Sequence, residues 1–245
     1  MNFCFPLRSL RVPFSFSVLF LVALELSFSP SGSAVCPVPE IKANGEFFKA
    51  NVVFVGRVLS IRTVPDKGND LGGWFYKLRV EELFRGPVAQ EITIFTENSS
   101  ARFPLAFKRE YLLFAYKQNR RLEIYSCGNS ARLSEARDSL QRLRNLRNRK
   151  QPTEIEGWVA PETVGIDVSG ITVTVKSRAR DYTAVTDKNG WFRLIALPGR
   201  YQVDFSSNEY YLNGADFYWY DSDNFILHPG ECASLQFVSV RHLAM

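Results

Sequence analysis

The chain has 245 residues, of which 46% are hydrophobic and 22% are charged, and its formal net charge at pH 7 is +5. This composition supports a buried core and excludes a wholly disordered, collagen-like or low-complexity chain. Neither His228 nor His242 belongs to a spaced set of zinc ligands, and no P-loop, HExxH or GxSxG pattern occurs. We therefore expect a protein that is not an enzyme and that uses no metal and no cofactor.

The first 34 residues are typical of a secretory signal peptide. Arg8 and Arg11 form a basic start, an apolar run follows over 12–26, and small residues precede a cleavage site after Ala34. The alternative is a transmembrane anchor, but the uninterrupted apolar part is shorter than the ~20 residues that a span needs. We expect a mature protein that is secreted or held in the periplasm or cell envelope, with no stable membrane span.

Cys36 closely follows this segment, and three roles are open to it. It could carry a lipid, chelate a metal ion or form half of a disulfide. A bacterial lipoprotein signal places a small residue directly before the lipidated cysteine, and the bulky Val35 fits that pattern poorly. Lipidation is therefore the less favoured interpretation.

Charge is distributed unevenly along the mature chain. Residues 36–150 contain 21 Lys and Arg against 12 Asp and Glu, whereas residues 151–245 contain 7 against 12. This asymmetry indicates either a basic binding surface or docking of the two halves on each other. Because the protein is expected outside the cytoplasm, nucleic acid is not an expected partner.

The first half of the mature chain is predicted to be rich in strands. Runs of β-branched and aromatic residues predict five strands, and alternation in the second of them directs Tyr76, Leu78 and Val80 toward a core. The expected strands are 51–64, 74–86, 90–96, 110–116 and 121–127.

A helix is expected on each side of these strands. The first is short and covers 40–50. In the second, over 134–150, apolar residues recur at helical spacing and Ser134 is the expected N-cap. Arginines cover the rest of the second helix, where a solvent-facing surface is the simpler interpretation and an anion-binding site is the alternative.

A polar break at 150–154 marks the expected boundary between two domains. Beyond it, turn signals separate about seven short strands, which predicts an antiparallel β-sandwich. The Asp-Lys-Asn-Gly sequence at 187–190 is expected to form a hairpin turn. The expected strands are 154–160, 170–177, 182–186, 191–197, 198–206, 216–220 and 234–240.

The stretch 208–221 is a candidate ligand surface because six aromatic residues fall within eleven positions. Alternation places Phe217 and Trp219 toward the core and Tyr218 and Tyr220 outward. The outward pair could stack on a sugar or on another protein. The favoured alternative is an aromatic strand that simply packs in the sandwich.

The first half resembles the netrin-type module shared by the tissue inhibitors of metalloproteinases. That resemblance implies a five-stranded OB-type barrel with a C-terminal helix over 35–150. Bacterial relatives usually carry a cysteine just before an FPL-like stretch, and the segment 99–105 here has none, so one family crosslink is absent. The stretches that carry the resemblance are Cys36, 47–61, 76–86, 109–116 and 122–136.

The second half resembles the carboxypeptidase regulatory-like domain, a transthyretin-like sandwich, over 154–240. Members of that family are non-catalytic accessories, so the resemblance implies attachment or recognition rather than chemistry. The residues that carry it are Gly157, Gly170 to Val173, Thr186 to Phe192 and Leu197 to Tyr201.

The cysteines are expected to form one crosslink. Cys4 leaves with the signal peptide, and in an oxidising compartment the remaining three permit one bridge. We favour Cys36–Cys127, because closure within one domain is the simpler geometry, over a pairing with Cys232. In the favoured case Cys232 remains a buried or free thiol.

Two functions compete at this point. The first is a non-catalytic protein that binds an extracellular protein or glycan. The second is a metalloproteinase-inhibitor-like protein, since inhibitors of that family chelate the zinc of their target through an N-terminal cysteine. Cleavage after Ala34 leaves Val35 in front of Cys36, which argues against inhibition.

Overall fold

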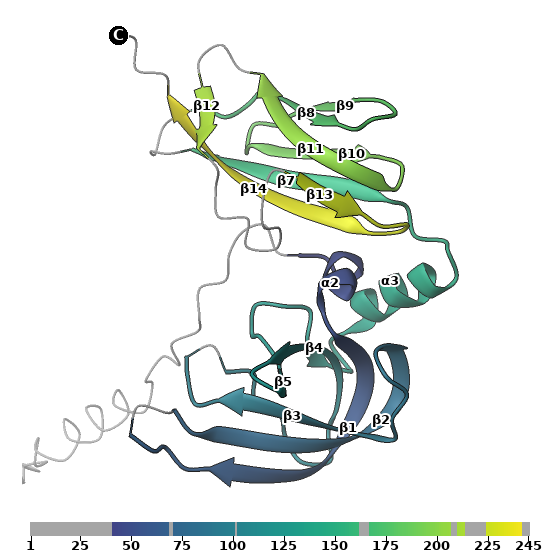
Figure 1. Ribbon diagram of the computed structural model, residues 1–245, viewed down its shortest axis with the longest axis vertical. Coiled ribbons are helices and arrows are strands. Elements are labelled where there is room, and N and C mark those ends of the chain that lie inside the picture. The colour runs from purple at the N-terminus through teal and green to yellow at the C-terminus, as the bar shows by residue number, and fades with distance from the viewer. Residues whose placement is uncertain are drawn as a thin grey trace, which may run out of the picture. The chain divides into compact units, whose positions relative to one another are not determined.

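The computed structural model describes residues 41–68, 71–100, 102–161, 167–206, 210–213 and 224–241 (Figure 1). This part of the chain is mainly β, as predicted. All of its helices and strands belong to one compact unit, Ala34–Met245. The predicted signal peptide, Cys36, the strand expected at 216–220 and His242 lie outside the described residues.

The first half of the described chain, called the ring region here, is built on a six-stranded sheet with the order β1-β2-β3-β5-β4-β6. β1 also pairs with β4, so the first five strands form a closed ring of hydrogen-bonded neighbours. All pairs are antiparallel except β3–β5, where Phe95 lies opposite Glu123. The elements are α2 (Ala43–Lys49), β1 (Val52–Val64), β2 (Gly73–Arg85), β3 (Glu91–Glu97), β4 (Glu110–Gln118), β5 (Arg121–Glu123), β6 (Ala131–Arg132) and α3 (Arg137–Arg147).

The start of β1, 52–55, and the middle of β4, 111–115, are continuous apolar runs whose two faces are both buried. Along β1, Phe54 belongs to one hydrophobic cluster while its neighbours Val53 and Val55 belong to another. The second cluster also contains Leu140 and Leu143 of α3, so this helix covers the outer face of these strands. Strands that are buried on both sides lose the alternation seen in strands with one wet face.

The core alternation predicted for β2 is confirmed. Tyr76 and Leu78 are buried, and the partly buried Val80 packs against the same cluster. The helix after the strands is confirmed too, but it begins later than expected. Its N-cap is Ala136, without a side-chain cap, because the backbone N–H groups of Glu135 and Ala136 bond back to Arg132 and Leu133 and make a turn there. The predicted capping role of Ser134 is therefore wrong.

The second half, called the two-sheet region, contains eight described strands rather than the seven expected. They form two four-stranded sheets, with the orders β10-β7-β14-β12 and β13-β11-β8-β9. Side chains from both sheets share one hydrophobic cluster. The strands are β7 (Glu154–Pro161), β8 (Thr172–Lys176), β9 (Tyr182–Val185), β10 (Trp191–Ile195), β11 (Gly199–Ser206), β12 (Tyr210–Asn213), β13 (Asn224–Leu227) and β14 (Cys232–Arg241).

Two features of these sheets depart from the prediction. β12 and β13 have four residues each, which is too short for alternation to stand out from a turn. The central pair β7–β14 is parallel, with Cys232 opposite Glu154 and Phe237 opposite Val159. All other described pairs in the two-sheet region are antiparallel.

A turn forms at 187–190 as predicted, but the prediction of a hairpin is wrong, because β9 and β10 on its two sides belong to different sheets. The Asp187 carboxylate accepts hydrogen bonds from the backbone N–H groups of Asn189 and Trp191, at 2.8 and 3.0 Å. Gly190 has φ +80°, and a Cβ placed there would lie 2.3 Å from the Val159 carbonyl oxygen. This position therefore needs glycine both for its backbone angle and for the space that a side chain would take.

Helix α2 contacts the two-sheet region through three side chains. Asn44, which is fully buried, donates a hydrogen bond to the Gly230 carbonyl oxygen at 2.8 Å. The ring of Phe48 stacks on His228 at 4.5 Å, and Lys42 pairs with Glu156. In the part of the chain that the structure describes, no helix is long and apolar enough to cross a membrane.

The same helix also carries Glu46 inward toward the ring region. This carboxylate is 1% exposed and accepts hydrogen bonds from the Tyr116 hydroxyl and from both the backbone and side-chain N–H groups of Asn129. Burial raises the pKa of Glu46, while these three hydrogen bonds act in the opposite direction. The polar side chains of α2 thus tie it to both halves of the described chain.

Candidate functional site

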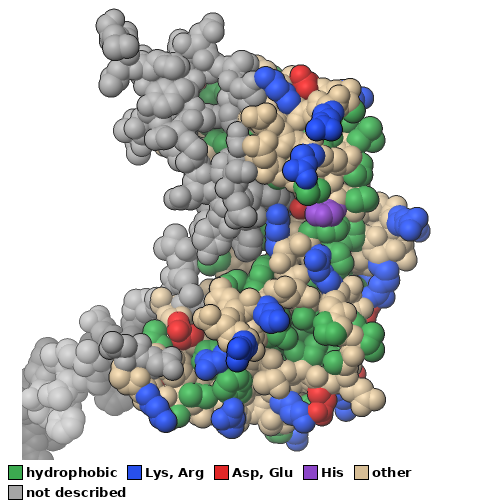
Figure 2. Space-filling model, in the orientation of Figure 1, with side chains coloured by type: hydrophobic (Ala, Val, Ile, Leu, Met, Phe, Trp, Pro, Cys, Tyr) green, Lys and Arg blue, Asp and Glu red, His purple; other side chains and the backbone are tan. Residues whose placement is uncertain are grey.

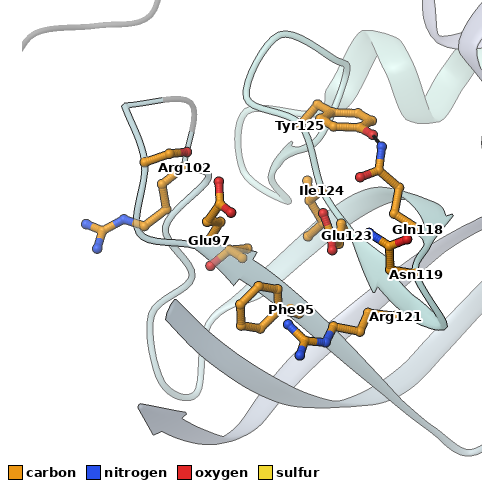
Figure 3. Close-up of a pocket in the computed structure, with 11 residues that line it drawn as sticks. Phe95, Glu97, Arg102, Gln118, Asn119, Arg121, Glu123, Ile124 and Tyr125 are labelled. Carbon is orange, nitrogen blue, oxygen red and sulfur yellow. Dashed lines mark hydrogen bonds between the residues drawn. The ribbon is translucent and has the colours of Figure 1, made fainter. Parts of the chain in front are cut away.

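A polar pocket of about 420 Å³ lies where β3, β5 and the loop after β3 meet. Figure 3 shows Arg102 on one side of it, Gln118, Asn119 and Tyr125 on the other, and Glu97 and Glu123 between them. Its lining residues are Phe95, Thr96, Glu97, Ser99, Arg102, Gln118, Asn119, Arg121, Glu123, Ile124 and Tyr125.

The hairpin between β4 and β5 forms one wall. Gln118 pairs with Arg121, so only Asn119 and Arg120 lie between the two strands, and both have positive φ values, 43° and 69°. Two-residue hairpin loops favour this conformation because it matches the twist of the flanking strands. Asparagine tolerates it well, whereas arginine rarely adopts it. The turn places Asn119 and Arg121 at the pocket and leaves Arg120 exposed and outside its lining.

Aromatic rings hold the arginines of this surface in place. The Arg121 guanidinium carbon lies 4.6 Å from the centre of the Phe95 ring and 5.7 Å from that of Phe75. Arg62 stacks on the same Phe75 ring at 4.7 Å. On the other side of the pocket, Arg102 lies 4.3 Å from the centre of the Trp74 ring. Stacking restricts these long side chains and leaves the N–H groups at the edge of each guanidinium available to a ligand.

This arrangement follows from the strand register. Phe75 of β2 lies directly opposite Phe95 of β3, and Arg62 of β1 lies directly opposite Phe75. The side chains of directly paired residues share one face of a sheet. The two phenylalanines, with ring centres 5.0 Å apart, therefore form a floor that Arg62 and Arg121 can both cover.

Two carboxylates line the pocket together with the arginines. The pKa of Glu123 is raised, first by burial and then by the negative charge of Glu97, and Arg121 opposes this shift. Opposite it, the side-chain amide of Gln118 donates a hydrogen bond to the Tyr125 hydroxyl, and the ring of Tyr125 packs against Tyr116 at 4.9 Å. The pocket therefore presents hydrogen-bond donors and acceptors of several kinds on supported side chains.

A second hollow, of about 610 Å³, lies on the two-sheet region, and its lining includes Leu197, Pro198, Tyr182 and Tyr201. The hydroxyls of its two tyrosines already form hydrogen bonds within the protein. The Tyr201 hydroxyl donates to the Leu197 carbonyl oxygen at 2.6 Å, and burial, followed by the contact with Tyr182, raises the pKa of Tyr201 to about 12. The pocket in the ring region, which carboxylate, amide and guanidinium side chains line together, is the better candidate.

The site residues predicted from the sequence are distributed differently. Tyr218, Tyr220 and Cys36 lie outside the described residues, so the aromatic platform and the Cys36–Cys127 crosslink stay predictions. Cys127 is partly buried in the turn that follows β5. Cys232 is a free, buried thiol on β14, and burial raises its pKa.

Reasoning from the sequence missed the pocket itself. Its residues come from three separate stretches, around 95–102, 118–119 and 121–125, and none of them carries a known motif. One sequence feature could have pointed to the pocket. The pair Asn119-Arg120 between two predicted strands indicates a tight turn with basic residues beside it. Among the described residues, no group of three or more His, Cys, Asp or Glu side chains is placed to hold a metal ion.

Comparison with known proteins gives little more. No family model matches the chain, and no curated protein matches it. Among solved structures, the chain is similar to one titled "The Bacillus anthracis TIE protein", with 11% identity and a TM-score of 0.29. The match covers 78% of this chain and 34% of that chain, so this protein spans only part of the length of that one. A likeness of this extent indicates nothing about function.

Proposed function

We propose that this protein is a secreted, non-catalytic binding protein whose ring-region pocket binds a saccharide of an extracellular glycan. One observation carries the proposal: planar polar side chains and aromatic rings converge on a single pocket of about 420 Å³. Sugar hydroxyls both donate and accept hydrogen bonds, and carboxylates, amides and guanidinium groups match them from either side. Small-molecule sites typically combine apolar walls with a few such groups.

The proposed architecture has two domains behind the signal peptide of residues 1–34. The first, over 35–150, is a netrin-type OB barrel like that of the metalloproteinase inhibitors, and the closed ring of β1 to β5 with α3 against it supports this. The second, over 154–240, is a carboxypeptidase regulatory-like sandwich, supported by two sheets around one hydrophobic cluster. A recognition role suits both domain types better than chemistry does.

A glycan is favoured over a protein partner because the pocket is small, polar and bordered by supported side chains. A protein interface would instead be expected to center on a broad apolar patch with a polar rim. The metalloproteinase-inhibitor alternative depends on the N-terminal amine of Cys36, and no contact among the described residues favours it.

The test is a screen of the intact secreted protein on a glycan array, followed by calorimetry on the saccharides that bind. Glu97→Gln should weaken binding at least severalfold, because it removes a carboxylate acceptor from the pocket. Glu91→Gln is the matched control, since Glu91 lies on the same strand but pairs with Lys77 outside the pocket. Equal affinity for both variants, or capture of a protein and no saccharide from the native envelope fraction, would argue against the proposal.

A further inference from the structure

Three arginines lie in or beside the ring-region pocket, and none of them forms an ion pair with another described residue. Arg102 and Arg121 line the pocket, and Arg62 shares the Phe75 ring with Arg121. Other exposed arginines of the ring region, in contrast, are engaged with acidic residues, for example Arg57 with Glu110 and Arg144 with Glu82. Arginines that are oriented by stacking and whose N–H groups are not held in an ion pair are the groups that a negatively charged ligand would use.

The surroundings add positive charge rather than cancel it. Within the pocket, the two arginines balance Glu97 and Glu123, but Arg62 and the exposed Arg120 of the neighbouring turn raise the local sum to an excess of positive charge. Figure 2 shows many Lys and Arg and few Asp and Glu side chains on one face of the molecule. A negatively charged ligand would be drawn toward such a surface at low salt.

Stacking also leaves Arg121 one defined edge for binding. One face of its guanidinium lies against Phe95, so a ligand would meet the N–H groups at the edge of the guanidinium plane. A planar fork of donors fits a carboxylate or sulfate with two parallel hydrogen bonds. A lysine at this position would supply the charge but neither the fork nor the stacking.

From these observations we infer that the saccharide bound in the ring-region pocket is acidic, with its carboxylate or sulfate on Arg121 and its hydroxyls on Glu97, Glu123 and the amides of the turn. This inference rests on the proposed function and names the substrate class for the same pocket. Arg102, on the far side, is placed to meet a second acidic group of a longer chain.

The experiment measures binding of the intact secreted protein to three oligosaccharides of equal length. They are a uronic acid oligomer, the same oligomer with its carboxyl groups reduced to alcohols, and a sulfated neutral oligomer. We expect the uronic acid or sulfated oligomer to bind at least tenfold more tightly than the reduced one, since hydrogen bonds between charged groups are the strong ones. The stronger of the two identifies the source of the acid.

Three variants separate the pocket from general charge. Arg121→Ala should lower affinity for the acidic oligomer about tenfold or more, and Arg121→Lys should recover only part of it because the fork is lost. Arg137→Ala removes the same charge at an exposed position at the start of α3, outside the pocket lining, and should change affinity less than threefold. Thermal unfolding of each variant checks that the fold is retained, and Arg121→Lys keeps the test valid if the alanine variant unfolds.

The outcomes distinguish the two proposals. If the reduced oligomer binds as well as the acidic one and Arg121→Lys has no effect, the acidic ligand is wrong while saccharide binding stands. If Arg137→Ala weakens binding as much as Arg121→Ala, the attraction is unspecific and the assignment to Arg121 is overturned. If no oligomer binds and the glycan array is also empty, both proposals fail.

Discussion

Asn44 of helix α2 donates a hydrogen bond to the carbonyl oxygen of Gly230, 186 positions away, at 2.8 Å. Both groups lie where the ring region meets the two-sheet region, and the side-chain oxygen of Asn44 has no partner among the described residues. A buried donor of this kind stabilises the fold chiefly because its loss leaves a carbonyl oxygen without a partner.

Replacing Asn44 tests this contact. Asn44→Ala should lower the free energy of unfolding by about 1–3 kcal/mol. Asn44→Asp keeps the shape but puts a carboxylate against the Gly230 carbonyl oxygen, so its loss should be larger. Chemical denaturation at neutral pH measures both. An aspartate variant more stable than the alanine variant would contradict the assigned role.

Glu46 should make stability depend on pH in a defined direction. Its pKa is raised above 4.5 by burial, so the folded state binds the proton more tightly than the unfolded state does. This contribution to stability is therefore complete below about pH 4.5 and is lost as pH rises through the raised pKa. Relative to Glu46→Gln, which cannot titrate, the wild type should gain stability as pH falls from 7 toward 4.5.

Denaturation curves of both proteins at several pH values in that range measure the effect. Glu46→Gln should itself lose about 1–3 kcal/mol, because Asn129 would face an amide group in place of one acceptor oxygen. A difference between the two proteins that shrinks toward low pH would show that hydrogen bonding, rather than burial, controls this carboxylate.

The turn at Gly190 allows a matched pair of alanine substitutions. Gly170 and Gly190 both have positive φ, 73° and 80°, but a Cβ at Gly170 meets nothing within 4 Å, whereas one at Gly190 overlaps the Val159 carbonyl oxygen. Gly170→Ala should cost about 1 kcal/mol from the backbone angle alone. Gly190→Ala should cost clearly more, because the turn must also move. Thermal unfolding compares them, and equal losses would mean that the backbone angle is the whole effect.

Arg120 offers a stabilising substitution. With φ at 69°, it sits in a conformation that costs a residue with a side chain roughly 1–2 kcal/mol, and glycine adopts it freely. Arg120→Gly should therefore raise the free energy of unfolding by up to about 1 kcal/mol. Asn119→Gly in the same turn should gain less, since asparagine tolerates this conformation. A loss of stability in Arg120→Gly would indicate contacts of the arginine that compensate for its backbone angle.

Peptide mapping addresses the crosslink and the mature N-terminus. Without reduction, we expect a peptide pair joining Cys36 to Cys127 and a mature chain that starts at Val35. Cys232 should react with a thiol reagent only after unfolding, because it is buried and its pKa is raised. A pair joining Cys127 to Cys232 would contradict this pairing, and a chain starting at Cys36 would revive the inhibitor alternative.

The strands β1 to β4 of the ring region could be predicted because each is long enough to show a pattern, whereas β6, with two residues, could not. β2 alternates clearly, with Tyr76 and Leu78 inward, and β1 is a long run rich in valine. The closure of β1 onto β4 was implied only by the barrel that the family resemblance predicts, since pairing between distant strands leaves no mark in either one. Ser134 was misassigned because a good capping residue within a turn looks the same in sequence as one that starts a helix.

The pocket could not be predicted for a related reason. Arg121, Phe95 and Phe75 become neighbours only through the register of β2, β3 and β5. In the sequence, Arg121 cannot be told from an arginine that simply faces solvent. The stacking that orients it depends on Phe95 and Phe75, which are 26 and 46 positions away. The parallel pairing of β14 with β7 was hidden in the same way, because local sequence favours no direction of pairing.

The position of β14 has a consequence for how the protein is made. This strand lies between β7 and β12 in its sheet, although residues 232–241 leave the ribosome after every other described residue. Until β14 has been synthesised, β7 and β12 therefore cannot be joined in one sheet, and one edge of β7 stays unpaired. Until then the two-sheet region cannot complete its fold, so a truncation just before β14 should yield aggregation rather than a smaller folded protein.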